Sequence, residues 1–335
     1  MKSFKSGMKQ TGKRGLYPSF HNGRRVLLML AVILCGVVVS MSIISCNEDV
    51  PRVDMEDVVK DEGASPVNDR RPAIRVAVAA MISPETTRDF YKDLIRLIAN
   101  RMGRRAVFLQ RRTYGEVNAM VAEKEVDVAF VCSGPYVQGH DEFGMEILAV
   151  PVAHGQDVYH SYIIVHRDSP FETFDDLKGK RFAFTDPHSN TGCLVPTYML
   201  ARQEETPKSF FKDTFFSGSH DNSIRAVAEG QADGAAVDSL IWEFMKNIDP
   251  SLTDRTRIIE KSPPYGIPPV VVHPELNPEL KKRLKAIFLS FHDDREVKAL
   301  LDRLQIDRFG EGKDTMYDTV REMRRWIKEK REKSP

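Results

Sequence analysis

Two loops with polar side chains each follow a predicted strand and open a predicted helix. Residues 186–192 (Asp-Pro-His-Ser-Asn-Thr-Gly) follow the strand predicted over 181–185, and residues 217–223 repeat the arrangement. The first N–H groups of a helix lack internal partners and carry partial positive charge. Hydroxyl and amide side chains beside them predict a site for a small anion, although an ordinary helix cap without a ligand has the same pattern. The candidate ligand residues of these loops are Ser189, Asn190, Thr191 and His220.

A third polar loop, residues 132–136, ends the strand predicted over 126–131. Ser133 and Tyr136 supply O–H donors there, and Tyr114 would reach the same place from a neighbouring loop. Ligands of open α/β sheets bind at the carboxyl ends of strands, which is where all three loops are expected to lie. An ordinary turn with a core tyrosine is the alternative.

The elements that would position these loops form two α/β series. Strands alternate with helices in each series, which predicts a mainly parallel sheet. A strand over 159–166 enters the second series, and the strand over 269–272 follows it, so two crossovers would form a hinge. Residues 275–335 are predicted to be mostly helical. The strands expected before that segment cover residues 74–78, 106–109, 126–131, 159–166, 181–185, 215–216, 233–237, 257–260 and 269–272.

The charge distribution argues against nucleic acid as a partner. Residues 1–45 carry seven of the 49 Lys and Arg residues and none of the 48 Asp and Glu residues. The remaining chain therefore has 42 basic against 48 acidic residues, a net charge of −6. A nucleic-acid partner would require a basic face.

The amino terminus resembles an export signal with a lipidation site. Residues 26–44 form an uncharged run after Arg24 and Arg25, and Ile-Ile-Ser-Cys at 43–46 resembles the bacterial lipobox. The resemblance implies that residues 1–45 are a signal peptide and that Cys46 is acylated and anchored in the lipid bilayer; an uncleaved signal anchor is the alternative. Asn47 favours the outer membrane, by analogy with Gram-negative sorting.

Residues 46–72 are predicted to be a flexible tether. The segment 47–72 has eight acidic residues, three prolines and no aromatic residue. Such a composition cannot bury enough apolar surface to fold. The body would then lie in the periplasm or cell envelope under either interpretation of the amino terminus.

Several motifs together resemble the phosphate, phosphite and phosphonate substrate-binding proteins of ABC transporters. The similarity covers about residues 74–308. The motifs are Gly-Pro-Tyr at 134–136, Leu-Lys-Gly-Lys-Arg-Phe-Ala-Phe-Thr-Asp-Pro at 177–187, Ser-Asn-Thr-Gly at 189–192, Gly-Ser-His-Asp at 218–221 and Ala-Val-Ala-Glu-Gly-Gln-Ala-Asp at 226–233.

The resemblance implies an α/β fold of the type II periplasmic binding protein class, with two lobes joined by a two-strand hinge. Lobe 1 would comprise residues 73–166 plus 262–335, and lobe 2 residues 167–261. The polar loops would bind a phosphorus oxyanion (phosphate, phosphite or phosphonate), with Tyr114 lining the cleft. Asp238 falls near an acidic family position. The expected partners are this ligand and an ABC permease in the inner membrane, and we expect a monomer without a cofactor or a metal site.

The sequence departs from the family at one segment. Phosphonate-selective members tend to carry Ile-Pro-x-Asp-Pro, whereas residues 267–270 are Ile-Pro-Pro-Val without an Asp. The identity of the oxyanion therefore stays open.

Other functions remain as alternatives. The same binding fold could feed a membrane histidine kinase or a chemoreceptor. A hydrolase is disfavoured because His220 and Asp221 are adjacent and point apart on a helix, which prevents a Ser-His-Asp relay.

Cys132 and Cys193 lie beside ligand loops of opposite lobes. We expect two free thiols, since a disulfide would hold the cleft shut.

Overall fold

A six-stranded sheet organises the first lobe of the structure, a computed structural model that describes residues 70–333 and side chains up to residue 330. The strand order is β2-β1-β3-β12-β4-β13. β1 pairs in parallel with β2 and β3, whereas β12 is antiparallel to β3 and β4. The strands are β1 (Ala73–Val78), β2 (Arg105–Gln110), β3 (Val128–Phe130), β4 (Glu146–Val152), β12 (Val270–Val272) and β13 (Arg308–Gly310).

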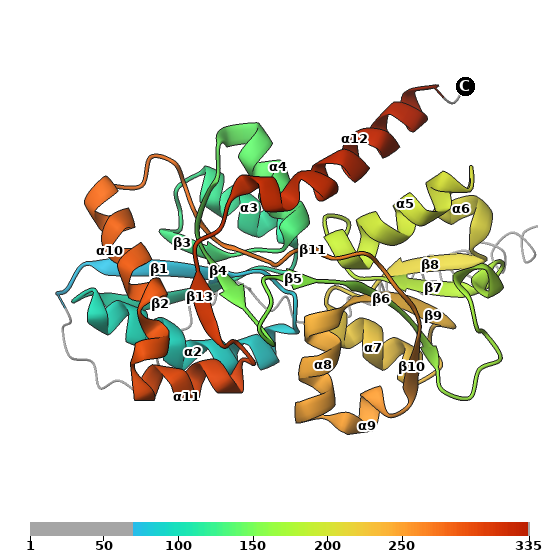
Figure 1. Cartoon of the computed structure of the whole chain (residues 1–335), viewed down its shortest axis with the longest axis horizontal. Helices are drawn as coiled ribbons and strands as arrows, with labels where there is room; N and C mark the ends of the chain where they lie inside the picture. The colour runs from blue at the N-terminus through green and yellow to red at the C-terminus, as the bar shows by residue number, and fades with distance from the viewer. Residues whose placement is uncertain (1–69, 334–335) are drawn as a thin grey trace, which may run out of the picture. The chain divides into compact units, whose positions relative to one another are not determined.

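Helices cover both faces of this sheet (Figure 1). One face packs against α2, α10 and α11, and the other against α3, α4 and α12. The elements are α2 (Pro84–Arg101), α3 (Tyr114–Ala122), α4 (Ser133–Phe143), α10 (Pro278–Leu289), η3 (Phe291–Asp293), α11 (Arg295–Arg303), η4 (Asp314–Tyr317) and α12 (Asp318–Lys333).

The second lobe is built on a five-stranded sheet with the order β10-β6-β9-β7-β8. β7 is parallel to both β8 and β9, and β6 is antiparallel to β9 and β10. Its elements are β6 (Ser161–His166), η1 (Phe174–Leu177), β7 (Arg181–Phe184), η2 (Asn190–Leu194), α5 (Val195–Arg202), α6 (Pro207–Phe210), β8 (Asp213–Phe216), α7 (His220–Ala228), β9 (Gly234–Asp238), α8 (Ser239–Ile248), α9 (Pro250–Thr253) and β10 (Thr256–Lys261).

Two short antiparallel strands, β5 (Val158–Tyr159) and β11 (Tyr265–Gly266), lie where the chain passes between the lobes. Their pairing brings the two crossovers side by side. The architecture is therefore the two-lobed type II fold that the sequence predicted.

Local sequence explains where several of these elements begin. The Thr113 side chain caps α3 by accepting a hydrogen bond from the backbone N–H of Glu116. The Glu116 carboxylate in turn accepts from the backbone N–H of Thr113, which completes a capping box. In β9 the small residues Gly-Ala-Ala-Val-Asp are all buried, as a strand covered on both faces requires.

The structure corrects several details of the expected layout. β4, β11 and β13 were not anticipated, because none of them carries a strong alternating pattern. The loop expected at 132–136 is the first turn of α4. β6 pairs within the second sheet, so sheet membership places the lobe boundary near residue 160, whereas 166 was expected.

The predicted signal peptide, lipobox cysteine Cys46 and most of the tether lie outside the described residues. Within the described part of the chain, no helix is both long enough and apolar enough to cross a membrane.

Candidate functional site

The carboxyl ends of three parallel strands in each lobe face the same cleft. In lobe 2, β7, β9 and β8 lead into the loops that carry Ser189, Asp238 and His220. In lobe 1, β2 and β3 lead to Tyr114 and Ser133. Parallel pairing puts such ends at one edge of a sheet, which is why residues far apart in the chain can share a site.

His220 is the centre of the lobe 2 side. It is fully buried, and its Nδ1 accepts a hydrogen bond from the backbone N–H of Asp238 at 3.1 Å. Burial lowers the pKa of His220 to about 3, so the ring is neutral at physiological pH. Because Nδ1 is an acceptor, the ring proton must reside on Nε2. The Nε2 atom faces the Ser189 hydroxyl at 3.5 Å and can act as an uncharged donor.

The Ser189–Thr191 loop is held so that its hydroxyls face inward. Ser189 Oγ accepts from the backbone N–H of Gly192 at 3.0 Å, which leaves its proton available for another acceptor. The Ser161 hydroxyl donates to the Thr191 carbonyl oxygen at 2.7 Å, and Asn190 Nδ2 donates to the Tyr159 hydroxyl at 3.1 Å. These bonds fix the loop without using the Thr191 hydroxyl.

Two buried atoms of this loop have no partner among the described residues: Thr191 Oγ1 and Asn190 Oδ1. Both residues are fully buried. Buried polar groups in folded proteins are almost always hydrogen-bonded, so these two atoms are candidates to bind a ligand or a water molecule.

Tyr114 contributes the corresponding group from lobe 1. Its hydroxyl is buried and makes no hydrogen bond of good geometry within the described residues. Burial raises the pKa of Tyr114 well above its ordinary value, although the neighbouring Ser189 hydroxyl lowers it. The phenol therefore stays protonated and can donate to a ligand oxygen.

Asp238 ends β9 and caps α8. Its Oδ1 accepts from the backbone N–H of Leu240 at 2.8 Å. Burial raises the pKa of Asp238 to about 7, against the opposing effect of backbone hydrogen bonds from Leu240 and Ile241. The carboxyl is thus partly protonated near neutral pH, and the protonated form can donate a hydrogen bond.

The structure uses the hydroxyls of Ser133 and Tyr136 elsewhere. Ser133 Oγ donates to the Gly266 carbonyl oxygen of the hinge at 2.7 Å. The Tyr136 hydroxyl donates to Asp314 at 2.9 Å, and its ring packs against Tyr317. Ser133 lies beside the cradle as a hinge contact, and Tyr136 points into lobe 1. We call five residues the oxyanion cradle, after the anion site that the sequence predicts: Tyr114, Ser189, Asn190, Thr191 and His220.

Direct hydrogen bonds join the two lobes across the cleft. The Tyr114 backbone N–H donates to Asp186 at 3.1 Å, and the Ser83 backbone N–H donates to Asp221 at 2.9 Å. Asp186 and Asp221 were not among the predicted site residues. Their only sequence signal is position, because Asp186 lies in the loop after β7 and Asp221 in the first turn of α7, which follows β8.

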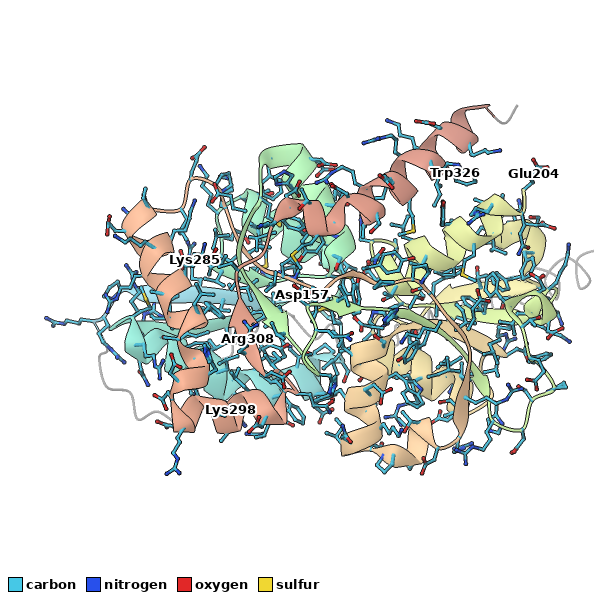
Figure 2. All side chains as sticks on the ribbon, in the orientation of Figure 1. Asp157, Glu204, Lys285, Lys298, Arg308 and Trp326 are labelled. Carbon is cyan, nitrogen blue, oxygen red and sulfur yellow. The ribbon has the colours of Figure 1, made fainter. Side chains whose placement is uncertain are left out.

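The carboxy-terminal helix α12 also contacts both lobes. Arg321 joins it to Asp141 of α4. Trp326, which Figure 2 labels on α12, packs edge to face on Tyr198 of α5, with ring centroids 5.2 Å apart. The lobes are therefore closed on each other in this structure.

Neither Cys132 nor Cys193 forms a disulfide within the described residues. Cys132 is fully buried, and burial raises its pKa to about 11. The thiol is therefore protonated and unreactive at neutral pH. Among residues 70–333, no cluster of three or more His, Cys, Asp or Glu side chains could hold a metal ion.

Comparison with known proteins assigns the family. The family described as "ABC transporter, phosphonate, periplasmic substrate-binding protein" matches residues 76–317. The chain belongs to this family. Its members are substrate-binding proteins of transporters rather than enzymes.

Two curated relatives are each 29% identical to this chain over the aligned residues. The phosphonates-binding periplasmic protein of Escherichia coli K12 aligns over 204 residues, 59% of this chain and 60% of the relative. The phosphate-import protein PhnD of Mycolicibacterium smegmatis aligns over 237 residues, 66% of this chain and 72% of the relative. The chain thus spans less than two thirds of the length of the E. coli protein.

Solved structures support the fold. The binding-protein component of a Pseudomonas aeruginosa ABC phosphonate transporter has a TM-score of 0.74 at 24% identity, covering 78% of this chain and 88% of that chain. PhnD1 of Prochlorococcus marinus, solved in complex with methylphosphonate, has a TM-score of 0.70 at 20% identity. The match covers 76% of this chain and 98% of PhnD1. At these identities the likeness establishes architecture only.

Proposed function

We propose that this chain is the extracytoplasmic solute-binding lipoprotein of an ABC importer and binds a small phosphorus oxyanion in the cleft between its lobes. The observation that carries the proposal is the oxyanion cradle, in which uncharged donors from both lobes are buried and partly unpaired. Family membership supports the transport role. The proposed partners are the inner-membrane permease and, through acylated Cys46, the lipid bilayer; the binding unit is a monomer without a cofactor.

Neutral donors suit a protein that must release its ligand. The hydroxyls of Tyr114 and Thr191 and the neutral imidazole of His220 can each donate one hydrogen bond to an oxyanion. Hydrogen bonds to a charged acceptor are stronger than neutral ones, so several of them in a closed cleft can bind tightly. Opening of the lobes returns these donors to water and releases the anion.

Calorimetric titration of the purified full-length chain tests the proposal. We expect phosphate, phosphite or methylphosphonate to bind in a one-to-one ratio. Sulfate serves as the comparison for general anion binding. If none of the four anions produced heat or a thermal shift, the oxyanion function would be rejected.

The unpaired hydroxyl of Thr191 supports a second prediction, Thr191→Val. Valine keeps the shape but removes a buried hydroxyl that has no hydrogen-bond partner within residues 70–333. We expect oxyanion affinity to fall by about 1–2 kcal/mol, roughly 5- to 30-fold, while the ligand-free protein is equally or more stable. Calorimetry and thermal unfolding measure the two effects.

Thr87→Val is the matched control for this variant. Thr87 is also buried, but its hydroxyl donates to the Ile82 carbonyl oxygen at 3.0 Å, within lobe 1. This change should destabilise the protein and leave its affinity unaltered. Undiminished affinity in Thr191→Val would remove Thr191 from the site.

A further inference from the structure

A groove beside the carboxy-terminal helix joins the two lobes on the outside of the protein. Its volume is about 740 Å³. Lobe 1 contributes side chains of α4 and α12, and lobe 2 contributes side chains from the segment between Pro187 and Thr197. We call this space the α12 groove. Because both lobes line it, the groove has this shape only while the lobes are closed on each other.

The charged side chains of the α12 groove are mostly basic. Four of them belong to α12, and the one acidic side chain is Asp141 of α4. Arg321 forms an ion pair with Asp141, so these two charges balance. Within residues 70–333, Arg324, Arg325 and Lys328 form no ion pair. The groove therefore presents three positive charges that no neighbouring carboxylate neutralises.

Arg324 shows what these cations lack. Its Nη1 donates a long hydrogen bond of 3.5 Å to a neutral acceptor, the carbonyl oxygen of Gly134. Burial lowers the pKa of Arg324, although the nearby carboxylates of Asp141 and Glu142 raise it. A desolvated cation is stabilised most by an anion at hydrogen-bond distance. The α12 groove therefore favours an anionic occupant.

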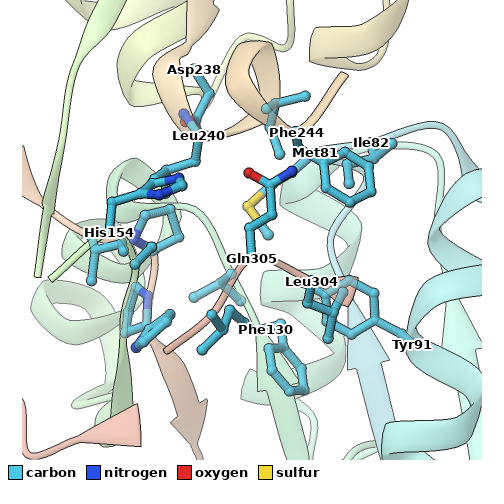
Figure 3. A pocket seen from close by; sticks show the side chains of 18 residues that line it. Met81, Ile82, Tyr91, Phe130, His154, Asp238, Leu240, Phe244, Leu304 and Gln305 are labelled. Carbon is cyan, nitrogen blue, oxygen red and sulfur yellow. The ribbon is translucent and has the colours of Figure 1, made fainter. Parts of the chain in front are cut away.

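Another cavity between the lobes has the opposite character (Figure 3). Its walls are mainly apolar side chains, including Met81, Phe130 and Phe244. Among its lining residues, which all belong to the described part of the chain, there is no Lys or Arg, and Asp238 is the single carboxyl. An acidic segment would thus be repelled from that cavity and attracted to the α12 groove.

Residues 48–62, in the predicted tether, have the composition that complements the α12 groove. They contain seven Asp and Glu residues against two Lys and Arg residues, a net charge of −5. Their apolar residues are Val50, Val53, Met55, Val58 and Val59. The groove likewise has apolar walls beside its cations, at Leu194 and Ile327. A segment that cannot fold alone can become ordered on such a surface.

The chain is long enough for this segment to reach the groove. Residues 48–62 lie 8 to 22 residues before residue 70, where the described part begins. An extended chain of that length spans up to about 27–75 Å, whereas the radius of gyration of a compact body of this size is about 18 Å. Attachment to the same chain also gives the segment an effective concentration on the order of millimolar at the groove.

We propose that residues 48–62 dock in the α12 groove of the same chain and act as an intramolecular ligand of the closed form. The inference goes beyond the proposed function, since it concerns neither the oxyanion nor the permease. Docking uses up the length of the tether after Cys46. The body would therefore lie closer to its anchor when the lobes are closed and be released to a longer reach when they open.

Carbodiimide cross-linking of the purified full-length chain tests the docking, because the reagent joins a carboxylate to a lysine amine only where the two are in contact. Lys328 is the one lysine that lines the α12 groove. We expect a cross-link within one chain between Lys328 and a carboxylate of residues 48–62, identified by peptide mass spectrometry. Lys282, which is exposed on α10 and lies outside the groove, should cross-link to this segment several-fold less.

The double variant Arg324→Gln/Arg325→Gln removes two cations of the groove and keeps Lys328 as the reporter. The Lys328 cross-link should fall by about threefold or more, since partly exposed ion pairs are individually weak but act together. The matched control is Arg88→Gln/Arg295→Gln, which removes two exposed cations of α2 and α11 outside the groove. This control should leave the yield unchanged.

Gly134→Ala tests whether docking requires closed lobes, because the added Cβ would meet the lobe 2 backbone at His188. It should also lower the Lys328 cross-link. The reaction is run without ligand and again with phosphate and with methylphosphonate, so the result does not depend on the oxyanion function. The inference would be overturned by an undiminished yield in Arg324→Gln/Arg325→Gln or in Gly134→Ala, by cross-links that join two chains, or by no cross-link at Lys328 under any of these conditions.

Discussion

Gly134→Ala is expected to reduce oxyanion affinity by about 100-fold or more while both lobes stay folded. Gly134 lies in the first turn of α4, and a Cβ atom there would be 2.3 Å from the carbonyl oxygen of His188 and 3.2 Å from the backbone nitrogen of Asn190. Both atoms are backbone atoms of lobe 2 and cannot rotate away. Overpacking typically costs about 1–3 kcal/mol and occasionally more; a clash with rigid backbone atoms is at the upper end, and here the cost applies only to the closed state.

The open protein should not be destabilised by this change, because alanine is a better helix former than glycine. Calorimetry measures the affinity, and thermal unfolding without ligand measures the stability. Gly139→Ala is the control in the same helix, because its Cβ would meet the flexible end of the Met145 side chain within lobe 1. It should bind normally. Wild-type affinity in Gly134→Ala would show that ligand binding does not require the lobe contact seen here.

Asp238→Asn is expected to stabilise the ligand-free protein by up to about 4 kcal/mol at pH 8 and not at all at pH 4. Burial raises the pKa of Asp238 from 3.8 to about 7. Between those values the folded protein holds a proton that the unfolded chain has lost, so the contribution of Asp238 to stability falls as pH rises. Below pH 4 the carboxyl is protonated in both the folded and the unfolded protein. Above pH 7 it is ionised in both, and the stability that depends on its proton is fully lost.

Asparagine removes this titration and remains a good helix cap for α8. His220 titrates in the opposite sense: burial lowers its pKa from 6.5 to about 3, so its contribution is lost as pH falls through that range. Because His220 is present in both proteins, its effect cancels in the difference. Urea unfolding of wild type and variant from pH 4 to pH 8 measures that difference.

Asp176→Asn is the control, because the pKa of Asp176 is shifted in the opposite direction to that of Asp238. Hydrogen bonds from the backbone of Glu172 and Thr173 lower the pKa of Asp176, which is fully exposed. Its replacement should give no gain in stability at high pH. A stability difference between Asp238→Asn and wild type that did not change with pH would show that the carboxyl is not buried as the structure has it.

The sequence by itself determined the local features of this protein. Strand-end loops rich in Ser, Thr and Asn, followed by helices, were recognisable because a capped helix start depends on a few neighbouring residues. The alternation of strands and helices predicted two α/β lobes, and His220 could be placed at the start of a helix. These features depend on interactions within a short stretch of chain.

Only the tertiary structure decided which polar groups remain available to a ligand. Ser133 and Tyr136 were equal candidates with Tyr114 in the sequence, but Gly266 and Asp314, more than 130 residues away, accept their protons. The Thr191 hydroxyl was left without such a partner in the part of the chain that the structure describes. Competition for hydrogen bonds between distant segments, like the close approach of Gly134 to His188, depends on how the lobes meet, and no local pattern encodes that.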